Sequence, residues 1–378
     1  MMNRDHRIGK RSIFNIASRW DALVPACIGL WLAAGDARAA DRDYRTLDKL
    51  SSTRLAIGGE FEWQGWKNFI VVTDTGRALE VAQKVRVDGP VEGIVEVGSK
   101  LYIWGKFETV NGQPHRNVAQ IDENTGEVAS WSLDYDNDFA VTAAKRKGAY
   151  LYVSGRFKGG FGAQTNYKSR TYRFSLSDGT RDPQWSTNRA ASVIRFHDGD
   201  MFYAQGHEVS GAIWKVGTEG STATETEVFK AGKEVVDFVV RNDGFYVLSS
   251  RRSGYGSSLS GGTWVQRHRR ADGELLWAWK DERTAHQLHS WDDHKRIGAI
   301  GGHVVVMFDD GASRFRVSDG QSVGFQSPTN GESRCGAAGQ KFDDFYFTNG
   351  DFLVVGDSLY RCRRHTFGRA PRFFEGSF

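Results

Sequence analysis

A unit of 44 to 58 residues recurs along this chain, and this repeat limits the folds that the chain can adopt. Each copy starts with a short apolar stretch that ends in Gly-x-Phe or in a remnant of that motif. The clearest copies are residues 101–107 (LYIWGKF) and 151–157 (LYVSGRF), and the copies start at residues 55, 101, 151, 201, 245, 303 and 352. A repeat of this length indicates one supersecondary unit that packs against copies of itself.

A second apolar stretch and a turn follow most of these copies. The turns contain Asp-Gly or Thr-Gly, which tolerate positive φ and join antiparallel strands, and they lie at Gly76, Gly126, Gly179, Gly273 and Gly320. A Trp follows the turn in three copies, at Trp131, Trp185 and Trp277. The chain has only 6 prolines, which agrees with many interior strands.

These features together predict an all-β fold. Strand–turn–strand units with glycine and aromatic residues at fixed places, and without a helical period, are typical of four-stranded blades arranged around an axis. We predict a single β-propeller of seven four-stranded blades over residues 41–378. Two separate sandwiches are disfavoured because they would not share one period.

The second copy, residues 101–131 (LYIWGKFETVNGQPHRNVAQIDENTGEVASW), resembles the delta-sixty repeat of secreted bacterial β-propellers. The resemblance is close in the second copy, clear in the first and third, and weak from the fourth onward. It implies a propeller fold and an exported location. It implies no activity, because the family has none in common and a fold does not determine function.

The first forty residues differ in character from the repeats. They contain a basic lead, an apolar run of 13 residues from Ala22 to Ala34, and a small-residue site at Ala37-Arg38-Ala39. A membrane-spanning helix needs about 20 apolar residues, so we interpret residues 1–40 as a cleaved secretory signal rather than an anchor. The mature protein would then have no transmembrane segment, and would lie in the periplasm, at the cell surface or outside the cell.

Export makes Cys335 and Cys362, the two cysteines that remain after signal removal, candidates for a disulfide. The bond would close a short loop near the C-terminus and stabilise the fold by about 3 kcal/mol. Two unpaired buried thiols are the alternative.

Strong catalytic and cofactor motifs are absent from the sequence. It has no Gly-x-Ser-x-Gly, His-Glu-x-x-His, phosphate-loop or dinucleotide pattern, and we expect no cofactor. The segment from Asp134 to Asp138 (DYDND) places carboxylates at alternate positions, as a calcium loop does. However, it lacks the glycine and the glutamate that such a loop requires, so turn formation explains it better.

One segment, residues 286–294 (HQLHSWDDH), combines three histidines with two aspartates. His286, His289 and His294 are ligand types that suit zinc or another transition metal. The segment lies in the longest interval between copies, where a connection to the next blade is expected. An ordinary solvated loop is the alternative, so we assign no metal and keep these histidines as candidates.

Trp63 and Trp66 flank a short segment between the second and third strands expected in the first blade. Two Trp side chains in a loop can form a sugar-stacking platform or a protein contact, and we predict a ligand-binding role for both. The alternative is that one of them closes the gap to a neighbouring blade.

Two function hypotheses remain. The first is an exported binding module, expected to be monomeric, that recognises an unknown protein or polysaccharide. Nucleic acid is disfavoured because 50 basic residues are nearly balanced by 46 acidic ones. The second is a polysaccharide lyase or hydrolase whose acid and base residues meet at the central channel. Its low-ranking candidate residues lie at blade entries: Glu92, Asp138, His197, Glu234, His289, His294 and Asp343.

Overall fold

The structure is a computed structural model. It describes residues 43–51, 54–63, 65–74, 79–133, 139–158, 167–205, 211–250, 262–281, 296–300, 302–308, 311–326, 346–348, 352–355, 358–361 and 375–377. All of them belong to the second of the two compact units into which the chain divides, Met1–Ala40 and Asp41–Phe378.

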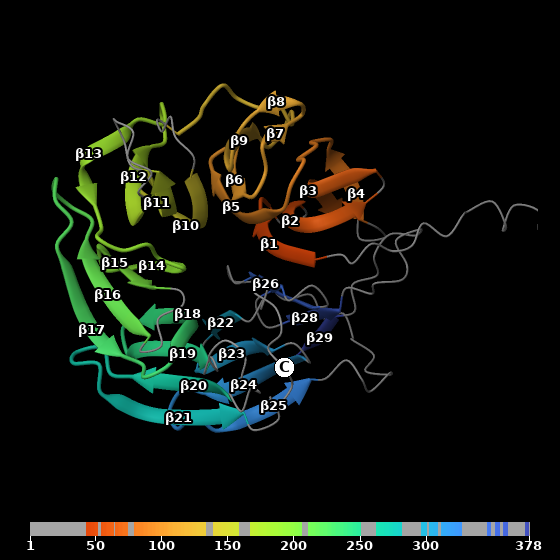
Figure 1. Cartoon of the computed structure of the whole chain (residues 1–378). Helices are drawn as coiled ribbons and strands as arrows, with labels where there is room; N and C mark the ends of the chain where they lie inside the picture. Colours follow the sequence, from red (N-terminus) through yellow and green to blue (C-terminus); the bar gives the residue numbers. More distant parts are fainter. Residues whose placement is uncertain are drawn as a thin grey trace, which may run out of the picture. The chain divides into compact units, whose positions relative to one another are not determined.

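Every regular element in the described ranges is a β-strand (Figure 1), which confirms the prediction of an all-β fold. None of these ranges contains a helix long and apolar enough to cross a membrane. The strands of the described residues form six four-stranded antiparallel sheets, one three-stranded sheet and one two-stranded ribbon. In every sheet the strands follow one another in chain order.

The first half of this unit contains three of the larger sheets and the ribbon. The first sheet is β1 (Asp43–Lys49), β2 (Arg54–Trp63), β3 (Trp66–Asp74) and β4 (Leu79–Gln83). The second is β5 (Val91–Val97), β6 (Lys100–Gly105) and β9 (Val118–Asp122), with the ribbon β7 (Thr109–Val110) and β8 (Gln113–Pro114) inserted before β9. The third is β10 (Phe139–Lys147), β11 (Tyr150–Lys158), β12 (Tyr167–Ser175) and β13 (Arg181–Ser186).

Four further sheets complete the described strands. They are β14 (Val193–His197), β15 (Asp200–Ala204), β16 (Ala212–Gly217) and β17 (Glu225–Lys230); then β18 (Glu234–Arg241), β19 (Gly244–Ser250), β20 (Thr263–His268) and β21 (Leu275–Asp281); then β22 (Arg296–Ile300), β23 (His303–Phe308), β24 (Gly311–Arg316) and β25 (Ser322–Gln326); and finally β26 (Tyr346–Thr348), β27 (Phe352–Val355), β28 (Ser358–Arg361) and β29 (Glu375–Ser377).

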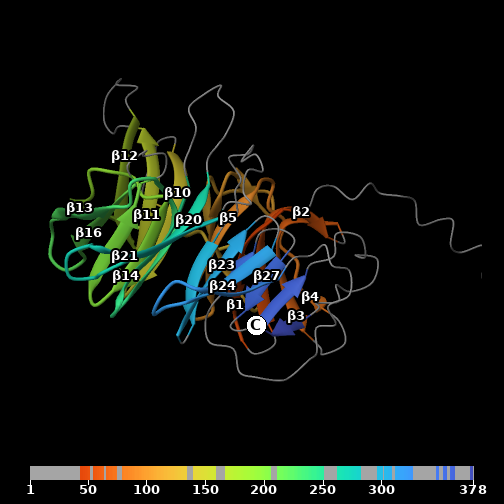
Figure 2. The same cartoon turned by 90° about the horizontal axis from the view of Figure 1, so that it is seen from below.

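The first strands of these sheets surround a common line, which we call the ring axis. Each first strand contacts the next one, in the order β1, β5, β10, β14, β18, β22 and β26, and β26 contacts β1 again. In Figure 1 these strands lie toward the middle, whereas last strands such as β13, β17 and β21 lie at the outside. Figure 2, turned by 90°, shows the strands of one sheet side by side, as in β10, β11 and β12.

The repeated motif of the sequence corresponds to the second strand of each sheet. The strands β2, β6, β11, β15, β19, β23 and β27 all begin within one residue of the predicted starts. The second sheet departs from the prediction of four strands, because within the described residues it has three. After β9 the chain forms only an isolated bridge between Ile121 and Val128 before it reaches Trp131, which lies outside a strand.

The hydrophobic core lies between neighbouring sheets. One cluster joins the second sheet to the third, through Tyr102 and Trp131 on one side and Val141 and Phe157 on the other. Equivalent clusters join the first sheet to the second, the third to the fourth, the fourth to the fifth and the fifth to the sixth. Both faces of an interior sheet are therefore buried, which explains the nearly continuous apolar stretches of the second strands.

The glycine of the Gly-x-Phe motif allows the first strand to approach closely. A Cβ atom added to Gly155 would lie 1.9 Å from the carbonyl oxygen of Ala140 on β10, so a larger residue would push the two strands apart. Phe157, two residues later, is fully buried in the cluster between the second and third sheets.

The Trp residues of the repeat pack beneath the turn of the following sheet. Trp185 packs edge-to-face on Tyr152, with ring centroids 5.0 Å apart, and its Nε1 donates to the carbonyl oxygen of Gly217 in the fourth sheet, at 3.4 Å. Trp277 donates in the same way to Val317 in the sixth sheet, at 3.0 Å. The Trp and the turn thus form a repeated contact between successive sheets.

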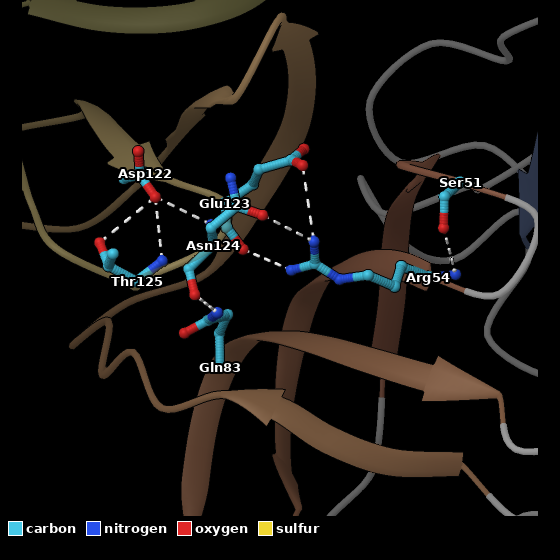
Figure 3. A network of polar contacts seen from close by, with 7 residues as sticks. All are labelled: Ser51, Arg54, Gln83, Asp122, Glu123, Asn124 and Thr125. Atoms are coloured by element: carbon cyan, nitrogen blue, oxygen red, sulfur yellow. Dashed lines mark hydrogen bonds and ion pairs between the residues drawn. The ribbon is translucent and has the colours of Figure 1, made fainter.

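A polar network at the turn after β9 joins the first and second sheets (Figure 3). The Asp122 carboxylate accepts hydrogen bonds from the backbone N–H groups of Asn124 and Thr125, each at 2.9 Å, and so shapes the turn. Arg54 of β2 donates to Asn124 Oδ1 at 3.2 Å and to the backbone carbonyl of Glu123. Gln83, at the end of β4, donates to the backbone carbonyl of Asn124.

Candidate functional site

Four charged residues lie on the first strands of four different sheets. They are Asp48 on β1, Lys145 on β10, Arg195 on β14 and Asp237 on β18, and we call them the axial cluster. The charges of Asp48, Arg195 and Asp237 all act on the Lys145 amine. Because β1 and β18 are not neighbours of β10 in the ring, these charges act on Lys145 from beyond the adjacent strands.

Asp237 is the most deeply buried member of the cluster, with 1% of its surface exposed. Its Oδ1 accepts hydrogen bonds from the Arg195 guanidinium at 2.5 Å and from the backbone N–H of Phe238 at 2.8 Å. Its Oδ2 accepts one from the backbone N–H of Ile297 on β22, at 3.1 Å. One carboxylate therefore connects the first strands of three successive sheets, and its buried charge is compensated.

Arg195 reaches from β14 to β18. Its Nε donates to the carbonyl oxygen of Phe238 at 2.9 Å, and one terminal nitrogen donates to its neighbour Ile194 at 3.0 Å. Together with the bond to Asp237, three of the five N–H donors of the guanidinium have partners. The remaining donors are available to another acceptor.

Asp48 joins the first two sheets in a similar way. Its Oδ2 accepts a hydrogen bond from the backbone N–H of Glu96 on β5, at 3.1 Å. Burial raises the pKa of the Glu96 carboxyl, and the nearby carboxylates of Asp48 and Glu123 raise it further. The Arg146 charge opposes this rise in the pKa of Glu96.

Lys145 differs from the other members because no hydrogen bond or ion pair is found for its amine in the described part of the chain. The side chain is exposed to solvent, yet protein surrounds it so closely that desolvation lowers its pKa. The Arg195 charge lowers this pKa further, and its effect is larger than the opposing effect of either Asp48 or Asp237. A water-accessible amine enclosed by protein fits a position that faces the ring axis.

A side-chain hydrogen bond links β10 to the residue that precedes β14 by two positions. Thr142 Oγ1 on β10 donates to the carbonyl oxygen of Ala191, which precedes β14, at 2.6 Å. The two first strands run in the same direction, because each sheet returns the chain to the start of the next. The contact therefore links the first strands of the third and fourth sheets near their starts.

Of the sequence-predicted candidates, Glu92 lies in β5 at a register shift between Val91 and Gly93. It forms an ion pair with Lys106, at 3.6 Å. The shift marks a β-bulge, a feature that is frequent next to functional sites. Other first strands have equivalent shifts, namely β1, β10 and β18.

Trp63 and Trp66 lie in strands rather than in the expected loop. They pair with each other at the end of the β2–β3 hairpin. Trp66 is half-buried against the cluster of Ile57, Phe61, Ile70 and Val72, and the Arg86 guanidinium lies 5.3 Å from its ring centroid. The Trp66 ring thus contributes to packing, while a ligand-binding role for the pair stays a prediction.

His197 lies in a separate polar cluster at the turns of the fourth and fifth sheets. Its Nε2 is 2.9 Å from Asn242 Oδ1 and 3.0 Å from a terminal nitrogen of Arg270. Arg270 also forms an ion pair with Asp198, at 2.5 Å. Glu234 is the first residue of β18.

The remaining candidates lie outside the described residues. They are Asp138 and the rest of its acidic segment, His286, His289, His294, Asp343, Cys335 and Cys362. The described ranges contain no group of three or more His, Cys, Asp or Glu side chains that could hold a metal ion. The predicted disulfide and the histidine segment therefore stay predictions.

Comparison with solved structures identifies the architecture. Hydrazine synthase from Kuenenia stuttgartiensis, whose fold is β-propeller-like, matches with a TM-score of 0.50, over 75% of this chain and 80% of that chain. This chain has a β-propeller-like fold. Because the sequence identity is only 9%, this match shows a shared fold and says nothing about a shared function. No protein-family model matches the sequence, and no curated protein matches it.

Proposed function

We propose that this protein is an exported β-propeller that binds a protein or a glycan, in the periplasm or at the cell surface, without catalysing a reaction. The observation that supports this proposal is the pattern of hydrogen bonds in the axial cluster. Arg195, Asp48 and Asp237 are hydrogen-bonded to backbone groups of neighbouring first strands, which makes them structural links. Lys145 is left as an accessible and unpartnered group that can hold a ligand.

A glycan-active enzyme is the second candidate, and the lowered pKa of Lys145 favours it. Amines with a lowered pKa are found at catalytic sites, where they act as bases or nucleophiles. A lyase or hydrolase would also need a group that donates a proton to the leaving oxygen. Within the described part of the cluster, both oxygens of the Asp237 carboxylate already accept N–H hydrogen bonds, which makes this side chain a structural link.

The proposal extends to the origin and compartment of the chain. The repeat in residues 101–131 supports a relationship to the delta-sixty propellers, and the leader of residues 1–40 supports export. We further propose that the mature protein is a monomer.

The test is a glycan array probed with the full chain, followed by product analysis for every glycan that is retained. We expect saturable retention of at least one glycan whose chain length is unchanged after prolonged incubation. Shorter saccharides or unsaturated ends in the retained glycan would contradict the binding function and favour the enzyme. If no glycan is retained, the ligand class is restricted to proteins.

A further inference from the structure

An aromatic ring of the first sheet holds an exposed cation in place. Arg86 lies in the connection between β4 and β5, and its guanidinium lies 5.3 Å from the centroid of the Trp66 ring. A guanidinium over an aromatic face is attracted by the negative charge of that face. Trp66 is itself half-buried against the apolar cluster of the first sheet. The ring therefore fixes the position of the exposed Arg86 side chain.

The backbone of Arg86 is fixed as well. Its N–H donates to Asn111 Oδ1 at 2.8 Å, and its carbonyl oxygen accepts a hydrogen bond from the Asn111 N–H at 2.7 Å. Asn111 lies in the turn of the β7–β8 ribbon, between Val110 and Gln113. Because both the backbone and the guanidinium are held, little conformational freedom remains to be lost when a ligand binds.

A second exposed cation, Lys84, lies two residues before Arg86. Lys84 and Arg86 are exposed, whereas Val85 and Val87 are buried, so the burial alternates as on an extended chain. On such a chain, side chains two residues apart project to the same side, about 7 Å from each other. Neither the Lys84 amine nor the Arg86 guanidinium has a hydrogen bond or an ion pair among the described residues. Their N–H donors are therefore open to a ligand.

The acidic side chains near these two cations are engaged with other groups. Asp88 Oδ1 accepts hydrogen bonds from two backbone N–H groups, at 2.9 and 3.0 Å, and its Oδ2 accepts one from the Thr109 hydroxyl at 3.0 Å. Glu62, close to Trp66 in the hairpin, forms an ion pair with Lys67 at 3.3 Å. The positive charge of the two cations therefore lacks a paired carboxylate in the part of the first sheet that the structure describes.

This arrangement matches the carboxylate groups of a hydrophilic ligand. A guanidinium binds a carboxylate through two parallel hydrogen bonds, and an ammonium binds it as a point charge. A protein ligand is a poorer match, because protein interfaces have an apolar core. The large apolar side chains that are exposed in the described ranges lie on the fifth and sixth sheets instead, at Leu275, Leu276 and Val323.

We propose that Arg86 and Lys84, with Trp66 supporting the guanidinium, bind the carboxylate groups of an acidic glycan, one that contains uronic acids. This inference rests on the proposed binding function and names its ligand class.

The test measures binding to the full chain by titration calorimetry at constant ionic strength. The probes are tri-galacturonate, its methyl ester, which keeps the sugar rings but removes the charge, and tri-glutamate, which keeps the carboxylates on a peptide. The variants Arg86→Met and Lys84→Met each remove one cation. Arg316→Met is the matched control, because Arg316 is an exposed arginine at the end of β24 in the sixth sheet, paired with Asp319 at 2.9 Å.

We expect tri-galacturonate to bind the wild type saturably. Binding should be weaker by at least about tenfold for Arg86→Met and by at least about threefold for Lys84→Met, because each loses charge-assisted hydrogen bonds. Arg316→Met should bind within about twofold of the wild type, since its charge lies far from the contact. Unchanged affinity of Arg86→Met or of Lys84→Met, or no binding of tri-galacturonate, would overturn the inference.

The comparison of probes uses only the wild-type chain, so it does not depend on the folding of a variant. The methyl ester and tri-glutamate should both bind at least about tenfold more weakly than tri-galacturonate. Equal binding of the ester would show that the carboxylates are not recognised, and equal binding of tri-glutamate would assign the two cations to an acidic peptide; either result overturns the inference. The proposed binding function fails separately, only if the glycan array shows cleavage.

Discussion

Lys145 is a residue whose position costs stability. Its amine is enclosed by protein, faces the charge of Arg195 and has no partner in the described structure. A desolvated cation without a partner destabilises the folded state relative to an apolar residue of similar size. Residues of this kind are typical of functional sites, where stability is exchanged for binding.

Replacement of this amine should therefore stabilise the protein at neutral pH. The folded-state pKa of Lys145 is lowered below the value of an unfolded lysine, so the charged amine opposes folding at every pH below about 10. We expect Lys145→Met to raise the midpoint of urea unfolding at pH 7, and Lys84→Met to leave it unchanged. A lower midpoint for Lys145→Met would show that the amine has a stabilising partner.

At the scale of single elements, the turns between third and fourth strands carry the contact between neighbouring sheets. Gly179, between β12 and β13, has φ of 76°, and an added Cβ would lie 2.0 Å from the carbonyl oxygen of Ser132, which precedes the third sheet. Gly148, between β10 and β11, also has a positive φ, of 58°, but an added Cβ would meet nothing within 4 Å. Both glycines have a positive φ, but only Gly179 lies so close to another segment that a side chain would clash with it.

This pair separates backbone strain from packing between sheets. We expect Gly148→Ala to destabilise the fold by about 1 kcal/mol, the cost of a left-handed alanine. Gly179→Ala should cost about 2 kcal/mol more, because the turn must move away from the second sheet. Urea unfolding of both variants measures the difference, and equal losses would mean that this turn does not hold the sheets together.

His268 of β20 makes a second contact between sheets that depends on protonation. Its ring stacks on Phe229 of β17, with centroids 4.1 Å apart, and its Nδ1 is 2.9 Å from the carbonyl oxygen of Gly273. Its Nε2 is buried without a hydrogen-bond partner. Burial lowers the pKa of His268 more than the bond to Gly273 raises it, so the folded state favours the neutral ring.

A pH profile of stability tests this contact. Because the folded-state pKa lies below the unfolded value of about 6.5, the stabilisation is complete above that pH and is lost as the pH falls toward the folded-state pKa. We expect the free energy of unfolding of the wild type to fall between pH 7 and pH 5. His268→Phe, which keeps an aromatic ring beside Phe229, should show a shallower slope. His115, whose pKa burial also lowers, titrates in both proteins. Parallel slopes would exclude His268 as a titrating group.

At the scale of the whole molecule, the contact between β26 and β1 closes the ring. We propose that the larger sheets are the seven blades that the repeat predicts, and a closed ring should unfold as one unit. A chain without residues 343–378 should therefore lose its cooperative unfolding transition, since β1 and β22 lose the strand packed between them. A chain without residues 1–40, the predicted signal, should keep the wild-type midpoint. An unchanged transition after the C-terminal deletion would contradict closure.

The fold could be predicted from the sequence because each element carries its own local signal. Gly155 and Phe157 mark a second strand, and Gly179 marks the turn that precedes the Trp of the last strand. The second sheet was harder to predict, because Trp131 keeps the pattern although the chain there forms only an isolated bridge. The sequence predicts a loop for the two-Trp segment, but the paired strands extend to both Trp residues.

The axial cluster could not be predicted, because its members come from four different sheets and share no motif. Each is a single charge within a first strand, such as Lys145 after Val141-Thr142-Ala143-Ala144. A charge inside an apolar first strand was the available signal. Glu92, predicted from its place at a blade entry, instead forms an ion pair with Lys106.

The central claim is that the first strands of the larger sheets form a closed ring around one axis, with β26 in contact with β1. The most direct measurement is a crystal structure of the full chain. We predict sheets closed around one axis, with the Asp237 carboxylate hydrogen-bonded to Arg195 and to the backbone N–H of Ile297. Strands β1 and β26 lying apart would contradict the account.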